Sequence, residues 1–97
     1  MFTSKQRSRL KSLAANIEPC AQMGKDGASE NFLTCVSQAL EARELIKINL
    51  LESGTDEPKK TAQEIADAVG AEVVIVMGRK AVLYRRSQKK GVEHIRY

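Results

Sequence analysis

The 97-residue sequence contains no tryptophan, one histidine and two cysteines. A structural zinc site needs four Cys or His ligands at paired spacings, and these few, distant residues exclude one. Cys20 and Cys35 also lack the CxxC spacing of a redox motif. Both lie in apolar stretches, so we expect reduced thiols that pack partly buried and form no bridge.

The residues required for catalysis are equally scarce. There is no P-loop, which needs two glycines five residues apart followed by Lys and Ser or Thr. A cysteine nucleophile would need a neighbouring base, and the single histidine, His94, lies in the basic C-terminal stretch. The carboxylates fall mostly on expected exposed helix faces or in the 52–57 loop. We therefore expect no enzyme: no catalytic residue, no metal site and no cofactor.

Long hydrophobic runs are absent. None approaches the roughly 20 residues of a membrane-spanning helix, and residues 1–13 lack the apolar core of a signal peptide. We expect a cytoplasmic protein without a membrane partner. With 42% hydrophobic residues, a single domain over 1–97 can form a modest core without metals or disulfides.

Charge is plentiful but uneven. Residues 1–25 hold five basic and one acidic side chain, residues 26–78 four and ten, and residues 79–97 seven and one. If the fold brings the two basic ends and the loop at 24–27 together, one face would attract polyanions. The alternative is that the ends are solvated and bind nothing.

Hydrophobic periodicity predicts three helices. The first covers roughly 3–16, with a stripe made of Leu10, Leu13, Ala14 and Ile17. The second follows Ser29, a suitable N-cap, and ends near Arg43. The third has two possible starts. Either Glu57 caps it with Pro58 in the first turn, or Thr61 and Glu64 form a later capping box; Gly70 ends it.

Four strands are expected, over 18–23, 45–51, 72–77 and 81–85. In the second, Lys47 and Asn49 lie on the face opposite Ile46, Ile48 and Leu50. The third, EVVIVM, is almost entirely apolar and β-branched, which predicts a central strand covered on both faces. Gly78, Arg79 and Lys80 form the turn of a closing hairpin.

The predicted order is therefore α-β-α-β-α-β-β, an open α/β sandwich with one mixed four-stranded sheet and three helices. We expect a basic, mobile tail from about residue 87. One shared core is predicted to contain Leu13, Ile17, Val36, Leu40, Ile48, Ile65, Val69, Val74 and Val76.

The stretch MGKDGASE, residues 23–30, separates Gly24 from Gly27 by Lys25 and Asp26, just before the second helix. A plain turn, in which glycine permits positive φ, explains it simply. The alternative is a phosphate-binding loop like that of RNA-binding KH modules. There, bare backbone approaches the phosphate, N–H groups donate, and the helix dipole adds positive charge.

Four segments, in this order and spacing, resemble the CRM family (chloroplast RNA splicing and ribosome maturation), specifically its small stand-alone bacterial YhbY-like members. They are SKQRSRLKSLA, MGKDGASENFL, ALEARELIKINLL and VMGRKAVLYRR. The resemblance implies a fold related to the C-terminal domain of translation initiation factor three. It also implies RNA binding, with bacterial members associated with precursors of the large ribosomal subunit. Asp26 departs from the neutral or basic residue expected in the loop.

We therefore expect a monomeric, cytoplasmic RNA-binding protein that acts in large-subunit assembly on ribosomal RNA or pre-ribosomal particles. The alternative is a protein-interaction module that docks a ribosomal or acidic protein without contacting RNA. With four aromatic residues and Phe32 expected in the core, base stacking should contribute little. The expected RNA-binding residues are Gly24, Lys25, Asp26, Gly27, Lys5, Arg7, Arg9, Lys11, Arg79, Lys80, Arg85 and Arg86.

Overall fold

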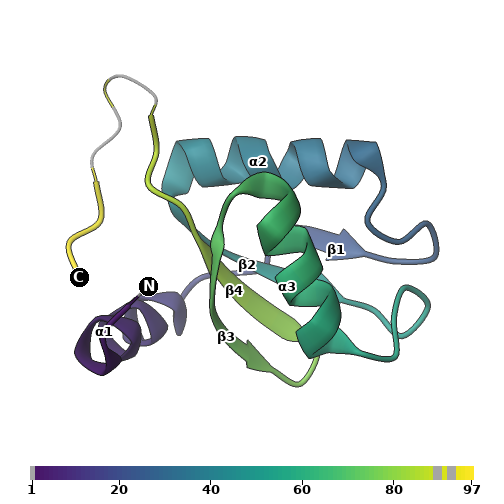
Figure 1. Ribbon diagram of the computed structural model, residues 1–97, viewed down its shortest axis with the longest axis horizontal. Helices are drawn as coiled ribbons and strands as arrows, with labels where there is room; N and C mark the ends of the chain where they lie inside the picture. The colour runs from purple at the N-terminus through teal and green to yellow at the C-terminus, as the bar shows by residue number, and fades with distance from the viewer. Residues whose placement is uncertain (1, 89–90, 92–93) are drawn as a thin grey trace.

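The computed structural model describes residues 2–88, 91 and 94–97 and contains three helices and four strands (Figure 1). Their order confirms the predicted α-β-α-β-α-β-β arrangement. The first helix and the first strand are both shorter than predicted. The elements are α1 Ser4–Ala14, β1 Ala21–Met23, α2 Glu30–Arg43, β2 Leu45–Leu50, α3 Pro58–Val69, β3 Glu72–Met77 and β4 Lys80–Tyr84.

The strands form one mixed sheet in the order β1-β2-β4-β3. β1 pairs with β2 in parallel, and β4 pairs antiparallel with both β2 and β3. β3 is therefore an edge strand, and the prediction of a central strand was wrong. Its apolar sequence reflects helices on both faces of the sheet, and coverage of the faces does not depend on how many strand neighbours it has.

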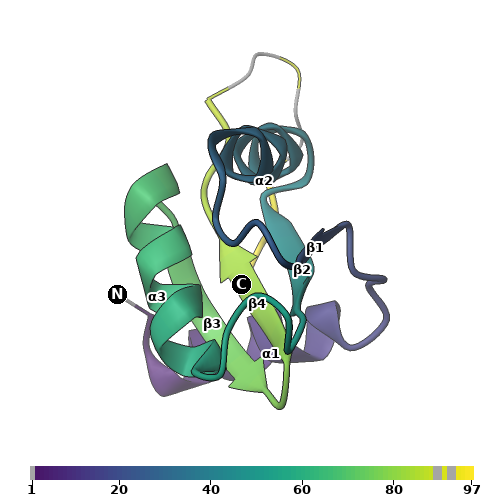
Figure 2. The same cartoon turned by 90° about the vertical axis from the view of Figure 1, so that its right-hand side faces the viewer.

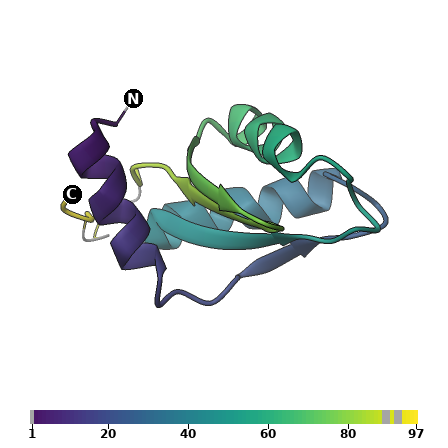
Figure 3. The same ribbon diagram turned by 90° about the horizontal axis from the view of Figure 1, so that it is seen from below.

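The helices divide between the two faces of the sheet. α2 and α3 cover one face and α1 covers part of the other (Figures 2 and 3). The first face packs Val36 and Leu40 of α2 and Ile65 of α3 against the strands. On the second face, Leu10 and Ala14 of α1 pack against the sheet.

The single predicted core is thus two cores separated by the sheet. Of the predicted members, Val74 and Ile17 belong to the α1 side and the others, apart from Leu13, to the α2/α3 side. Leu13 is 43% exposed, so its inclusion was wrong. α1 meets the sheet along a narrow stripe, and Leu13 lies outside it.

A bulge in β3 explains how both faces of this strand become apolar. The register with β4 shifts between Val73 and Ile75, so Val74 and Ile75 both pack on the α1 side. Arg7 of α1 reaches over this irregular edge, where its Nη1 donates to the carbonyl oxygens of Val73 and Val74. Arg7 thereby ties α1 to the backbone of this edge strand.

The helix ends largely follow the sequence signals. Ser29 caps α2, since its Oγ accepts from the Phe32 N–H at 3.2 Å. α3 starts after Glu57 with Pro58 in the first position, so the later capping box was wrong. The Thr61 hydroxyl instead pairs with that of Thr55 at 2.7 Å. Gly70 ends α3 in the left-handed conformation, at φ +69°.

Both cysteines are free. Cys20 is half-buried against the α2/α3-side core, and this burial raises the pKa of its thiol. Cys35, in contrast, is exposed on α2, so its prediction as a partly buried packing residue was wrong. Among the described residues, no helix has both the length and the apolar character needed to cross a membrane.

Candidate nucleic-acid interface

The 24–27 loop is a tight turn that leads directly into a capped helix. The Gly27 N–H donates to the Gly24 carbonyl at 2.9 Å, which leaves Lys25 and Asp26 exposed at the tip. Gly27 has φ +66°, and open space surrounds the position of a Cβ there. The loop therefore presents two charged side chains of opposite sign at the N-terminal end of α2.

Gly54 packs against the backbone of this loop, a role that the sequence analysis did not predict. A Cβ at Gly54 would lie 2.6 Å from the Gly24 carbonyl oxygen and 2.9 Å from that of Met23. A Cβ at Gly24 would instead meet nothing closer than the Ser53 Oγ at 3.6 Å. In this structure, close backbone packing therefore requires glycine at 54 and not at 24.

Arg79 fastens the hairpin turn to the same end of the sheet. Its Nη1 donates to the carbonyl oxygens of Leu50 at 3.1 Å and Thr55 at 2.7 Å, and its Nε lies 4.0 Å from Glu52. The guanidinium is therefore engaged within the protein, where it holds the loop that follows β2. Lys80 is exposed beside it. The turn, this loop and the 24–27 loop thus share one end of the molecule.

The helix α1 lies at the opposite end of the longest axis (Figures 1 and 3). The two ends of the chain do meet there, with the rings of Phe2 and Tyr97 centred 5.5 Å apart. The 24–27 loop lies at the other end, so the condition set for one shared basic face, that all three regions come together, is not met. Lys5, Arg9 and Lys11 are exposed on α1, whereas Arg7 is half-buried and bonded to β3.

Between α1 and the loop, part of the second face of the sheet is not covered by a helix (Figure 3). Asn49 lies opposite Lys80 across the β2–β4 pair, on the same face as Lys47. Lys47 is 8% exposed, Asn49 is half-buried and Lys80 is exposed. The alternating pattern of β2 marked Lys47 and Asn49 as sharing a polar face. Asn49 and Lys80 are accessible on this open face between the 24–27 loop and α1, whereas Lys47 is almost entirely buried.

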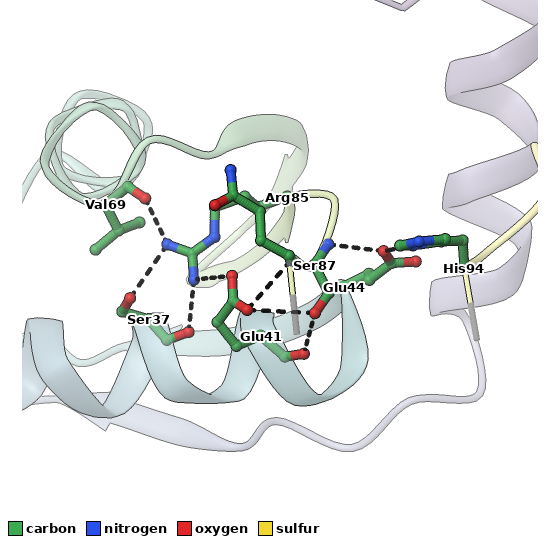
Figure 4. Close-up of polar contacts among 8 residues, drawn as sticks. Ser37, Glu41, Glu44, Val69, Arg85, Ser87 and His94 are labelled. Carbon is green, nitrogen blue, oxygen red and sulfur yellow. Dashed lines mark hydrogen bonds and ion pairs between the residues drawn. The ribbon is translucent and has the colours of Figure 1, made fainter. Parts of the chain in front are cut away.

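Arg85 is bonded within the protein, to α2 and to the end of α3 (Figure 4). Its Nη1 donates to the Val69 carbonyl at 2.7 Å and to Ser37 Oγ at 3.1 Å, and its Nη2 donates to the Ser37 carbonyl at 2.8 Å. Nη2 also pairs with Glu41 at 3.3 Å. The guanidinium thereby ties the end of α3 to α2. Its neighbour Arg86 is exposed.

Six of the predicted cations are exposed: Lys5, Arg9, Lys11, Lys25, Lys80 and Arg86. Arg7, Arg79 and Arg85 are half-buried and donate to backbone carbonyls. The described residues contain no cluster of three or more His, Cys, Asp or Glu side chains suited to a metal ion.

A family model for the CRS1/YhbY (CRM) domain matches residues 2–85 of this sequence. The chain belongs to the CRM family. YqeI of Bacillus subtilis, named a probable RNA-binding protein, is 34% identical over 92% of this chain and 93% of its own length. A Haemophilus influenzae relative named RNA-binding protein is 33% identical over 95% and 93%.

A solved structure shares the fold. The solution structure of the hypothetical protein SAV1595 from Staphylococcus aureus superposes with a TM-score of 0.78 and is 40% identical. The match covers 96% of this chain and 98% of that one. The 24–27 loop and the β3–β4 hairpin lie within the residues that match the CRM model.

Past the CRM match, the tail is fastened to the body by Glu44. This carboxylate is fully buried and accepts hydrogen bonds from the N–H groups of Ser87 and Ile95, each at 2.7 Å, and pairs with His94 Nδ1 (Figure 4). Glu44 ends α2 at φ +65°, a conformation unusual for a residue with a side chain. Residues 89–90 and 92–93 of the predicted mobile tail lie outside the described residues.

The pKa of Glu44 reflects this role. Burial of the carboxylate raises its pKa, but the hydrogen bonds from His94, Ile95 and Ser87 together outweigh burial and lower it below the usual 4.5. The folded state thus favours the ionised form. Its stabilising contribution is complete above the usual pKa and is lost as the pH falls through the lowered folded value.

We expect Glu44→Gln to lower the free energy of unfolding by about 1–3 kcal/mol, because an amide replaces a charged acceptor of several donors. Thermal denaturation at neutral pH measures the loss. Glu64→Gln, on the exposed face of α3, is the matched control and should change little. The deficit of Glu44→Gln should shrink as the pH falls through the lowered pKa. An equal deficit at all pH values would contradict the ionised clamp.

Proposed function

We propose that this protein binds RNA through a surface that runs from the 24–27 loop, across the open face of the sheet, to α1. The observation that carries the proposal is the loop itself. Gly27 at φ +66° turns the chain into a capped helix, and Lys25 is exposed at the tip. Relatives named as RNA-binding proteins support the same reading.

The chemistry of this end suits a phosphate group. A turn flanked by glycines lets the backbone approach the anion closely, and the N-terminus of α2 contributes partial positive charge. Lys25 adds a full charge, and Asp26 beside it reduces the attraction. Phosphate contacts carry no sequence information, so this loop would position RNA and would not select its bases.

The exposed lysines and arginines beyond the loop extend the proposed surface. Lys80 lies on the open face, and Lys5, Arg9 and Lys11 lie on α1. We assign no direct RNA contact to Arg7, Arg79 or Arg85, whose donors are bonded to backbone carbonyls. Action in large-subunit assembly, on ribosomal RNA, is the biological role that the family resemblance supports.

The test is the salt dependence of binding to a labelled single-stranded RNA. Lys25→Ala should weaken binding by a similar factor for every RNA sequence. It should also flatten the log–log salt slope by about 0.7, the value expected for one phosphate neutralised on a single strand. Lys59→Ala, an exposed charge loss in the acidic middle of the chain, is the control and should have little effect.

If the wild-type protein bound no RNA at low salt, the proposal would fail. The protein-docking alternative would then be favoured. Binding that Lys25→Ala leaves unchanged, with an unchanged salt slope, would remove the loop from the interface.

A further inference from the structure

Three aromatic rings from distant parts of the chain meet near α1. Phe2, Tyr84 and Tyr97 have ring centroids 5.0–5.6 Å apart, and each pair meets edge to face. They are three of the four aromatic residues of the sequence. Tyr84 is 6% exposed, Phe2 is half-buried and Tyr97 is 39% exposed. Tyr84 therefore lies at the buried bottom of the cluster, and Tyr97 is its most accessible ring.

A pocket of about 320 Å³ opens beside these rings. Phe2, Tyr84 and Tyr97 line it together with the exposed Arg86 and with Glu72. A second hollow of about 500 Å³ shares Gly70, Arg85 and Arg86 with it, so Arg86 borders both. The volume of the first pocket is at the small end of the range for ligand sites, which begins at about 300 Å³.

We propose that this pocket holds one unpaired nucleotide of a single-stranded RNA, with its base against Tyr97 and its phosphate on Arg86. The inference rests on the proposed RNA-binding function and adds a second, chemically different contact to it. Every base has a π-face, so stacking on an aromatic side chain tolerates any sequence. A base must leave its helix to be held this way, which selects single-stranded over duplex RNA.

The charges around the pocket orient the nucleotide. Arg86 is exposed at the pocket, so the phosphate lies on the Arg86 side and the base on the side of the three rings. Arg85 also lines the pocket, but its terminal nitrogens are bonded to Ser37, Glu41 and Val69. Arg86 is therefore the phosphate donor. The three rings that line the pocket would contribute nothing to a bare anion, whereas they offer apolar contact to a base.

The position of the pocket extends the proposed RNA path. It lies at the α1 end, where Arg9 Nε donates to the Arg96 carbonyl at 3.5 Å and joins α1 to the tail. The 24–27 loop occupies the other end of the longest axis (Figure 1). The expectation that stacking contributes little came from counting aromatics, and the fold gathers three of them at one site.

The chain itself carries a probe of this pocket. It has no tryptophan and two tyrosines, Tyr84 and Tyr97, both in the cluster. Tyrosine fluorescence therefore reports on this site alone, and Tyr84→Phe isolates Tyr97. We expect an oligouridylate to quench this emission. Inorganic polyphosphate, which has charge but no bases, should bind without an equal quench.

Variants then separate stacking from charge. Tyr97→Leu should raise the Kd for a labelled oligouridylate at least about fivefold, the lower end of base–aromatic stacking. Tyr97→Phe keeps the ring and should bind as the wild type. Arg86→Gln should weaken binding and flatten the salt slope by about 0.7. Lys59→Gln, in the first turn of α3, is the matched charge control and should change little.

The outcomes distinguish this inference from the proposed function. Salt-dependent RNA binding that loses affinity in Lys25→Ala but not in Tyr97→Leu, with no tyrosine quench, would overturn the pocket alone. A wild-type protein that binds no RNA would overturn both. Circular dichroism checks that Tyr97→Leu is folded. If it is not, the quench and Arg86→Gln decide the matter.

Discussion

Replacing Ile65 with Asp should abolish the cooperative thermal unfolding transition of this protein. Ile65 is 1% exposed, in the centre of the core between α3 and the sheet. A carboxylate there would be buried among apolar side chains, which costs several kcal/mol unless it finds a partner. The total stability of a native domain is about 5–15 kcal/mol, so a loss of this size removes most of it.

Leu13→Asp is the matched control. The change in chemistry is the same, but Leu13 is 43% exposed on α1, so its carboxylate stays in water. Circular dichroism should show a transition close to that of the wild type for Leu13→Asp and none for Ile65→Asp. If both variants melted like the parent, the assignment of the α3 stripe to the core would be wrong.

The contrast between Ile65 and Leu13 shows what hydrophobic periodicity can predict. Spacing identified the apolar side of each helix, and it correctly placed Ile65, Val36 and Leu40 inside. It could not say how wide a stripe the sheet would cover. The residues of α1 that are buried against the sheet are Leu10 and Ala14. For the same reason, Cys35 followed an apolar stretch in sequence and yet lies on the exposed face of α2.

Strand order is the other part of the fold that local sequence left open. The apolar run in β3 correctly predicts cover on both faces. It contains no information on the neighbours within the sheet, which depend on β4 turning back to lie beside β2. Arg7 then donates to carbonyls of this edge strand, a long-range contact across 66 residues that no local pattern contains.

The sequence alone predicted which basic residues the candidate site could contain, but not which of them are bonded within the protein. Lysine and arginine side chains can be counted from sequence, but their bonding partners cannot. Arg79 and Arg85 each donate to backbone carbonyls from distant segments. Gly54 likewise matters because of the Gly24 carbonyl 2.6 Å from its would-be Cβ, 30 residues apart in sequence. Lys5, Lys11, Lys25 and Lys80 are exposed and are the best candidates for contact with phosphate.

The 24–27 loop allows the sharpest test of backbone contact. Gly27→Asp should weaken binding to single-stranded RNA by about 10- to 100-fold, the equivalent of one hydrogen bond to a charged group. The fold should survive, because a side chain at position 27 enters open space. The strain at φ +66° is modest for Asp, which enters the left-handed region more readily than most residues.

Two further variants divide this effect into its causes. Gly27→Asn has the size and backbone tolerance of Asp without its charge, so the difference between them measures repulsion of the phosphate. Gly24→Ala adds a single methyl group that meets no atom closer than 3.6 Å. It should therefore leave the melting temperature unchanged. A phosphate that approaches the Gly24 backbone would still be displaced by that methyl, and RNA affinity would fall. If the loop were merely a turn, Gly24→Ala and Gly27→Asn would bind RNA like the wild type, and only the charge of Gly27→Asp would register in the salt dependence.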